Sequence, residues 1–251
     1  MAANTGERTL IPAIIPPGAT HVDGVFSAGS PGDTMLIPLV AAAAGSLLLD
    51  FMTRVVPKGD IRAPQFSRLP LPSFEAVGKY LALRALRLNC VTESYTSLWE
   101  SLYDNDFNAD EWATEAGSLC SQPLSAVGPK WTPNTPLRRA ADRRQALLEI
   151  DVLIALSVGI SIDELAVIYR TQFPVLYGYD KRTDYYDVGG RLVPNKVLSV
   201  WRKKADAMSL DERTAAHPSS GATYTYSPPF ITLDREADMK SAYSIFLQRF
   251  Y

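Results

Sequence analysis

Apolar residues recur at helical spacing along much of this chain. The longest apolar stretch, residues 35–52, contains one proline and one aspartate and is too short to span a membrane, so it predicts a buried helix. Ser161 and Glu164 have the spacing of a capping box, which places the start of another helix at Ile162. The same periodicity predicts further helices at residues 80–91, 137–158, 162–171, 196–208 and 234–251.

Other segments have the residue types of strands and turns. Residues 9–15 carry β-branched side chains and stop at a Pro-Pro-Gly turn, so we expect a strand there and a second short strand at residues 21–26. Residues 180–194 hold Gly189 and Gly190 at their centre, which predicts a β-hairpin with a glycine turn. Residues 217–229 are expected to form a loop.

These elements together predict an α+β protein. Residues 1–75 form a small strand-helix-strand segment in this interpretation, and residues 76–251 form a mainly helical region with one β-hairpin. A chain of 251 residues can bury a core as one large domain or as two small ones. Hydrophobic residues make up 47% of the chain and charged residues 21%, which excludes a disordered protein.

Charge is unevenly distributed although the formal net charge is only −2. No Lys or Arg lies between Arg87 and Lys130, a stretch that contains seven acidic residues. From Lys130 to Arg144 the balance reverses, with Asp142 as the one acidic residue. A local basic face is therefore compatible with an acidic chain.

Few residues have the arrangement of a metal or nucleophile site. The two cysteines, Cys90 and Cys120, are too few for a secreted disulfide framework, and with His21 and His217 they make a poor zinc site. We expect free, buried thiols in a reducing cytoplasm.

The N-terminus lacks the pattern of a signal peptide, and no membrane association is expected.

Two groups of cations are candidates for DNA contact. The first group surrounds a Pro-Lys-Gly-Asp turn, where glycine permits close approach of a phosphate backbone; its alternative is an ordinary solvated loop. The second group lies at the start of the helix predicted at residues 137–158. The two groups are Arg54, Lys58, Arg62 and Arg68, and Arg138, Arg139, Arg143 and Arg144.

The helices predicted at residues 137–158 and 162–171 have the outline of a helix-turn-helix. The second helix carries Asp163, Glu164, Ala166 and Val167, which are poor residue types for meeting base edges. A structural helical hairpin is therefore the favoured interpretation over a recognition helix.

The sequence Ser227-Pro228-Pro229-Phe230 has the form of the loop that holds the target amino group in amino-methyltransferases. That chemistry also needs a Gly-rich turn to bind S-adenosylmethionine, and the sequence contains none. A proline-rich connector into the last helix is the favoured alternative.

Three segments resemble the C-terminal target-recognition region of bacterial N6-adenine DNA methylases from restriction-modification and phage-defence systems, of type IIG-like, DISARM-like and BREX-like kinds. The order of an apolar helix, a short strand and a Leu-Pro-Leu-Pro exit matches, although Ala44, Gly45 and Ser46 replace the small-polar turn usual in that helix. The motifs Gly-Ile-Ser-Ile-Asp-Glu-Leu and Tyr-Asp-Val-Gly-Gly-Arg-Leu-Val-Pro also match. The segments are residues 7–18, 36–72 and 143–194.

This resemblance implies a protein that recognises double-stranded DNA without catalysing a reaction. The family's catalytic and cofactor motifs match no position here, so it implies no catalytic, cofactor-binding or metal residue in this chain. S-adenosylmethionine would bind a methylase catalytic domain or partner, which would flip and methylate the adenine. Two alternatives stay open: a protein-interaction subunit of a defence complex, and a complete small methyltransferase that uses Ser227-Pro228-Pro229-Phe230.

Overall fold

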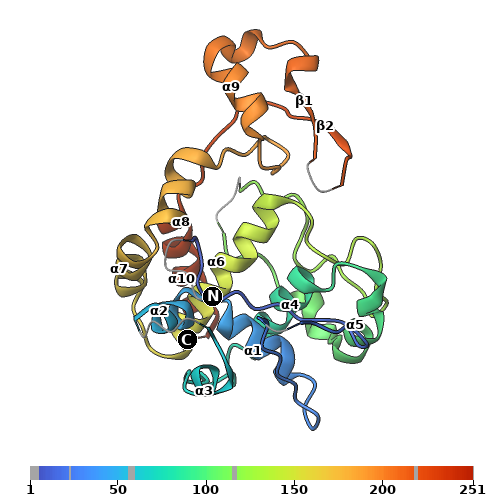
Figure 1. Ribbon diagram of the computed structural model, residues 1–251, viewed down its shortest axis with the longest axis vertical. Helices are drawn as coiled ribbons and strands as arrows, with labels where there is room; N and C mark the ends of the chain where they lie inside the picture. Colours follow the sequence, from blue (N-terminus) through green and yellow to red (C-terminus); the bar gives the residue numbers. More distant parts are fainter. Residues whose placement is uncertain (1–5, 23, 56–59, 115–117, 218–219, 251) are drawn as a thin grey trace.

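The computed structural model describes residues 6–22, 24–55, 60–114, 118–217 and 220–250 (Figure 1). About 51% of the chain is helical and two short strands form an antiparallel hairpin, so the predicted mainly helical fold with one hairpin is confirmed. The α-helices and strands are α1 (Leu36–Ala44), α2 (Leu47–Val55), α3 (Ala63–Phe66), α4 (Gly78–Asn89), α5 (Thr96–Leu102), α6 (Ala140–Ser157), α7 (Ile162–Gln172), α8 (Pro174–Gly178), α9 (Asn195–Lys204), α10 (Arg235–Phe250), β1 (Thr214–Ala216) and β2 (Thr223–Thr225). Short helical turns occupy Glu93–Tyr95, Asn105–Ala109, Tyr179–Thr183, Ala205–Ala207 and Asp211–Arg213.

The helix predicted at residues 35–52 is two helices, α1 and α2, which meet at an angle of 59°. Ser46 causes the break, because its hydroxyl donates to Ala43 O at 2.7 Å and accepts from Leu49 N at 3.3 Å. The Asp151 carboxylate also accepts from Leu47 N at 2.7 Å, at the start of α2. These side chains cap a new helix where the sequence pattern predicted a continuous one.

None of the described helices is alone long and apolar enough to cross a membrane; the bent pair α1 and α2 meets that criterion only by combined length and composition. Both helices bury apolar side chains in the main core of the protein, including Leu39, Leu47 and Leu48.

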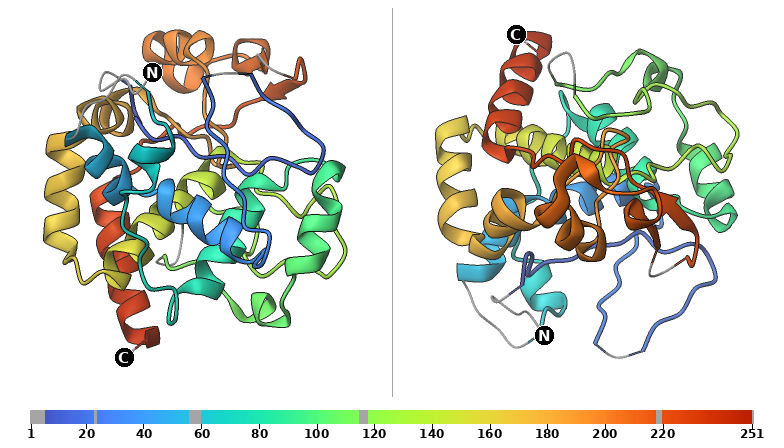
Figure 2. Two further views of the ribbon diagram at one scale, coloured as in Figure 1. Left: turned by 60° about the horizontal axis from the view of Figure 1, so that its bottom comes forward. Right: turned by 90° about the horizontal axis from the view of Figure 1, so that it is seen from above.

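Helix α6 lies at the centre of the main core and is buried along most of its length. It packs against α2, α4, α7 and α10, as the two views of Figure 2 show. The cluster draws on residues from Leu10 to Phe246. The segments 1–75 and 76–251 predicted from the sequence therefore contribute to one shared core.

A second, smaller core defines what we call the small lobe, residues 185–230. This lobe contains α9, β1 and β2 and projects from one end of the molecule (Figure 1). In its hairpin, Thr214 pairs with Thr225 and Ala216 with Thr223. The lobe joins the main body through an antiparallel bridge between Tyr186 and Ile231 and through a hydrogen bond from Ala141 N to Gly190 O at 3.0 Å.

The predicted strands at residues 9–15 and 21–26 are wrong. The structure describes all of these residues except Asp23, and none of the described ones lies in a strand. Two backbone N–H groups of residues 9–15 donate to side chains. Thr9 N donates to the Asp50 carboxylate and Ile14 N to the Asn89 side chain. A strand is unnecessary once these backbone groups are satisfied.

The predicted hairpin at residues 180–194 is also wrong as a two-stranded element. It is reduced to a bridge between Tyr186 and Leu192, with Gly189 and Gly190 in its turn as expected. The true hairpin, β1 and β2, includes residues that were predicted to be a loop.

Gly190 is required where the small lobe meets the main body. Its φ is +73°, and an added Cβ would lie 2.8 Å from Leu119 O and 3.1 Å from Ala141 Cβ. Gly159 has a similar φ of +74° but open space around it. We expect Gly190→Ala to cost about 1–3 kcal/mol more than Gly159→Ala in urea unfolding, because only Gly190→Ala adds overpacking to backbone strain. Equal costs would contradict this packing.

Two clusters of buried charges join α6 to its neighbours. In the first, the Arg84 guanidinium lies between the Glu149 and Asp110 carboxylates. In the second, Asp180 accepts from Arg235 Nε at 2.6 Å and from the Tyr169 hydroxyl at 2.8 Å. Arg144 Nε lies 3.6 Å from the same carboxylate. The centre of the protein is therefore held by paired charges as well as by apolar packing.

Candidate nucleic-acid interface

Arg54, predicted to contact DNA, has a structural role inside the protein. Its side chain is 5% exposed and lies 4.2 Å from the centre of the Phe173 ring. The guanidinium donates to Gln172 O at 2.7 Å and to two carbonyls of the N-terminal segment at 3.0 Å. These bonds fix the N-terminal segment to α2 and α7, and they leave Arg54 little surface for a phosphate.

The other members of the first predicted group differ in position. Lys58 lies outside the described residues. Arg62 and Arg68 are exposed beside α3, and Arg62 lies 3.6 Å from the Asp60 carboxylate. Their exposure is compatible with DNA contact, which stays a prediction for this group.

Three arginines of the second group donate to backbone carbonyls. Arg138 Nε donates to Pro133 O at 2.9 Å, although this side chain is exposed. Arg139 Nη1 donates to Gly189 O at 2.5 Å and so ties the small lobe to the start of α6. Arg143 Nη1 donates to Leu88 O and Leu137 O, both at 3.1 Å, and burial lowers its pKa.

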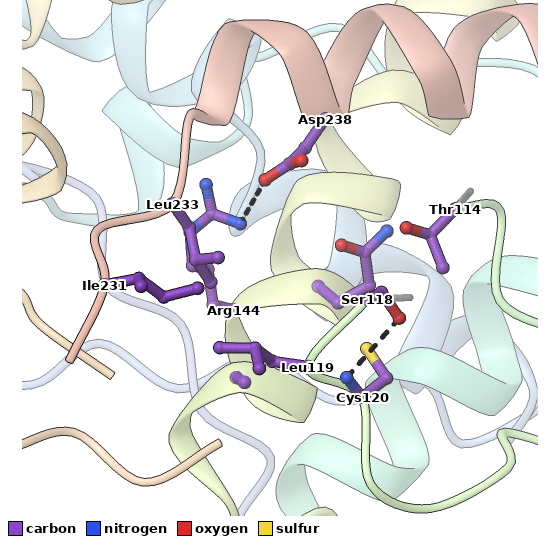
Figure 3. Close-up of a pocket in the computed structure, with 10 residues that line it drawn as sticks. Thr114, Ser118, Leu119, Cys120, Arg144, Ile231, Leu233 and Asp238 are labelled. Carbon is purple, nitrogen blue, oxygen red and sulfur yellow. Dashed lines mark hydrogen bonds and ion pairs between the residues drawn. The ribbon is translucent and has the colours of Figure 1, made fainter. Parts of the chain in front are cut away.

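Arg144, the last of this group, is buried beside a cavity of about 240 Å³. The cavity lies between the start of α6, residues 118–120 and the segment that leads into α10. Figure 3 shows the Arg144 guanidinium directed at Asp238, and Nη1 lies 2.6 Å from that carboxylate. With Asp180 as its second acidic neighbour, the Arg144 charge is neutralised inside the protein.

The four arginines near the start of α6 therefore do not form one basic face. Arg138 and Arg139 precede the helix, and each guanidinium reaches a different neighbour. Helix α7 begins at Ile162 with the predicted capping box, so its start is confirmed. Because α6 is buried and α7 packs against α2 and α10, the pair forms a structural helical hairpin.

The Ser-Pro-Pro-Phe sequence ends inside the small lobe. Phe230 is buried, and its ring centre lies 5.5 Å from that of Trp201. Ser227 N donates to Asp187 Oδ2 at 3.3 Å. The aromatic ring that would have to face a target base is instead part of the second core.

Cys90 is buried and Cys120 is half-buried. Burial raises the pKa of Cys90 to about 12 and that of Cys120, which lines the cavity, also to about 12. Since the thiolate is the reactive form, we expect neither cysteine to react readily with a disulfide reagent at pH 8 in the folded protein. Both should react in urea. Fast labelling of the native protein would contradict the described burial.

Helix α9 in the small lobe presents a different basic surface, which the sequence patterns did not single out. Its exposed residues are polar or basic, and the helix contains no acidic residue. Lys196, Ser199 and Lys203 are spaced i, i+3 and i+7, so they follow one face. The exposed residues of the helix other than Lys204, which we call the α9 face, are Asn195, Lys196, Ser199, Arg202 and Lys203.

The opposite side of α9 fixes the helix to the small lobe. Val197 and Leu198 are fully buried, and the Trp201 ring packs between Phe230 and Tyr185 at centre distances of 5.5 and 5.6 Å. The Arg202 guanidinium lies 5.7 Å from the centre of the Tyr185 ring. The α9 face is therefore presented by a rigid support.

The small lobe is also more basic than the rest of the chain. It contains six Lys or Arg residues and four Asp or Glu residues, against a net charge of −2 for the whole protein. Lys204 pairs with Glu212, whereas Lys196 and Lys203 form no ion pair with any residue that the structure describes. Alternating apolar and basic residues at helical spacing were the signal that could have identified this face.

Within the described ranges, no three His, Cys, Asp or Glu side chains gather where they could hold a metal ion. Comparisons with family models, with curated proteins and with solved structures find no significant match to this chain.

Proposed function

We propose that this chain is the DNA-binding, sequence-recognition part of a bacterial restriction-modification or anti-phage DNA methylase system, without a catalytic site of its own. Double-stranded DNA binds the small lobe. A partner catalytic domain binds S-adenosylmethionine and methylates adenine at N6. The complex acts in the cytoplasm.

The α9 face is the observation that carries this proposal. Phosphate contacts need cations that are exposed and free of competing carboxylates, and Lys196 and Lys203 meet both conditions within the described residues. The projection of the small lobe from the main body gives a duplex access to this helix (Figure 1). Arg54 and Arg144, by contrast, already have internal partners.

Replacing Lys196 and Lys203 with alanine tests the proposal. We expect affinity for a duplex of about two helical turns to fall about tenfold or more at low salt, because two phosphate contacts are lost. The measurement is fluorescence anisotropy of a labelled duplex, with circular dichroism to verify folding.

The matched control replaces Lys79 and Lys130, which are exposed on the main body, with alanine. It changes the net charge by the same amount but leaves the α9 face intact, so affinity should change little. Equal losses in the two double variants would point to a general charge effect and contradict the assignment to α9.

One observation favours the alternative of a protein-interaction subunit. Apolar side chains near the N-terminus are unusually exposed: Ile11 is 79% exposed, Val22 82% and Val25 57%. Exposed apolar surface of this kind is typical of a docking segment. Co-purification with a methylase subunit that is lost on Val22→Asp, combined with no DNA binding, would favour this alternative.

A further inference from the structure

The dimensions of α9 match the major groove of B-DNA. An α-helix with its side chains is about 10–12 Å across, and the major groove is about 12 Å wide, so the groove admits the ten-residue α9. Lys196 and Lys203 lie on the same face, separated by seven positions, or about two helical turns. Their long side chains can reach phosphates while the helix between them faces the groove.

Ser199 lies between the two lysines and has a short side chain. Its hydroxyl donates to Lys196 O at 2.9 Å, within the helix itself. The α9 face is thus recessed at Ser199, because long cationic side chains precede and follow this short one along the helix. This profile lets the helix backbone approach the floor of a groove.

Asn195 begins α9 and lies on the same face as Ser199, four positions away. It is exposed, and its amide has no hydrogen-bond partner in the part of the chain that the structure describes. Recognition helices contact base edges with residues near their N-terminal end. An asparagine amide can donate to N7 and accept from N6 of adenine in a bidentate pair.

We propose, on the basis of the DNA binding proposed above, that α9 enters the major groove and that Asn195 reads an adenine there. Lys196 and Lys203, which share one face of the helix, bind phosphates of the DNA strand that borders that face. Ser199 permits the close approach that brings the Asn195 amide to the base edge. Sequence recognition and phosphate binding are thereby divided between different residues of one helix.

Selection of bound duplexes from a randomised pool tests this assignment. The wild-type chain, with its methylase partner where one is required, should select an adenine at one position. Asn195→Ala should remove that preference, lower affinity for the selected sequence about tenfold or more, and leave affinity for unrelated duplexes unchanged. The Lys196→Ala, Lys203→Ala double variant should instead weaken binding to all sequences equally.

A second pair of variants tests the close approach. Ser199→Ala keeps a short side chain at this position and should retain the preference for adenine. Ser199→Leu places a larger side chain between the helix and the groove and should abolish binding to the selected sequence. Position 199 is exposed, and folding of both variants is verified by circular dichroism.

The possible failures are distinguishable. Absence of duplex binding by the wild-type chain overturns the proposed function and this inference together. Duplex binding without an adenine preference, or a preference that survives Asn195→Ala, overturns only the role of Asn195 and leaves DNA binding intact.

Discussion

Replacing Arg84 with alanine is expected to destabilise the protein by about 3–5 kcal/mol. Arg84 is fully buried, with Nη1 2.6 Å from Asp110 and Nε 2.6 Å from Glu149. Removing the guanidinium leaves the Glu149 carboxylate buried without its cation. Urea unfolding at neutral pH measures the loss, and a change below about 1 kcal/mol would contradict the central role of this cluster.

Two further variants identify the cause of the Arg84 effect. Lys130→Ala removes an exposed member of an ion pair, so its cost should stay within about 1 kcal/mol. Arg84→Leu combined with Glu149→Leu removes both charges and should be less destabilising than Arg84→Ala, since Asp110 keeps Arg249 at 3.5 Å. A double variant as unstable as the single one would indicate lost packing, or the loss of Glu149 as the acceptor of Ala113 N and Gln145 Nε2, and not an unpaired charge.

Replacing Asp180 with alanine should also cost about 3–5 kcal/mol, because Arg235 and Arg144 would lose a shared carboxylate. Asp180 and Arg235 are both nearly inaccessible, and the Tyr169 hydroxyl would lose its acceptor as well. This cluster joins α6, α7 and α10. Urea unfolding should therefore show a larger loss for Asp180→Ala than for Asp234→Ala, which removes an exposed cap at the start of α10 and should cost about 0.5–2 kcal/mol.

The Asp180 cluster predicts a pH dependence of stability. Burial alone would raise the pKa of Asp180, but Arg235, Arg144 and the Tyr169 hydroxyl bring it below its ordinary value. A depressed carboxyl pKa contributes stability above the unfolded value of about 4 that is lost as pH falls through the folded pKa. The difference in unfolding free energy between wild type and Asp180→Asn should shrink below about pH 4. A constant difference would contradict the charge pairing.

Several of the longer helices were predictable because their information is local, whereas α3, α5, α8 and the break between α1 and α2 were not predicted. Apolar spacing located α6, α7, α9 and α10 within a few residues, and the Ser161 capping box fixed the start of α7. The strands were not predictable in this way. Residues 9–15 obtain their hydrogen bonds from distant side chains such as Asp50 and Asn89, and the true hairpin has strands of only three residues.

The candidate site was less predictable than the fold, because residue type does not reveal a partner. Arg144 and Lys203 are both cations on predicted helices, yet Arg144 pairs with Asp238, 94 residues away. Tertiary packing thus determines which cations are available to DNA. The α9 face emerged only when burial identified the apolar side of that helix.

The most direct test of the central claim is the affinity of the chain for duplex DNA as a function of salt concentration. We expect the logarithm of the binding constant to fall linearly with the logarithm of salt, and the slope to become shallower by about 2 when Lys196 and Lys203 are replaced. Absence of binding at low salt, alone or with a methylase partner, or a slope unchanged by the substitutions, would contradict DNA recognition by the α9 face.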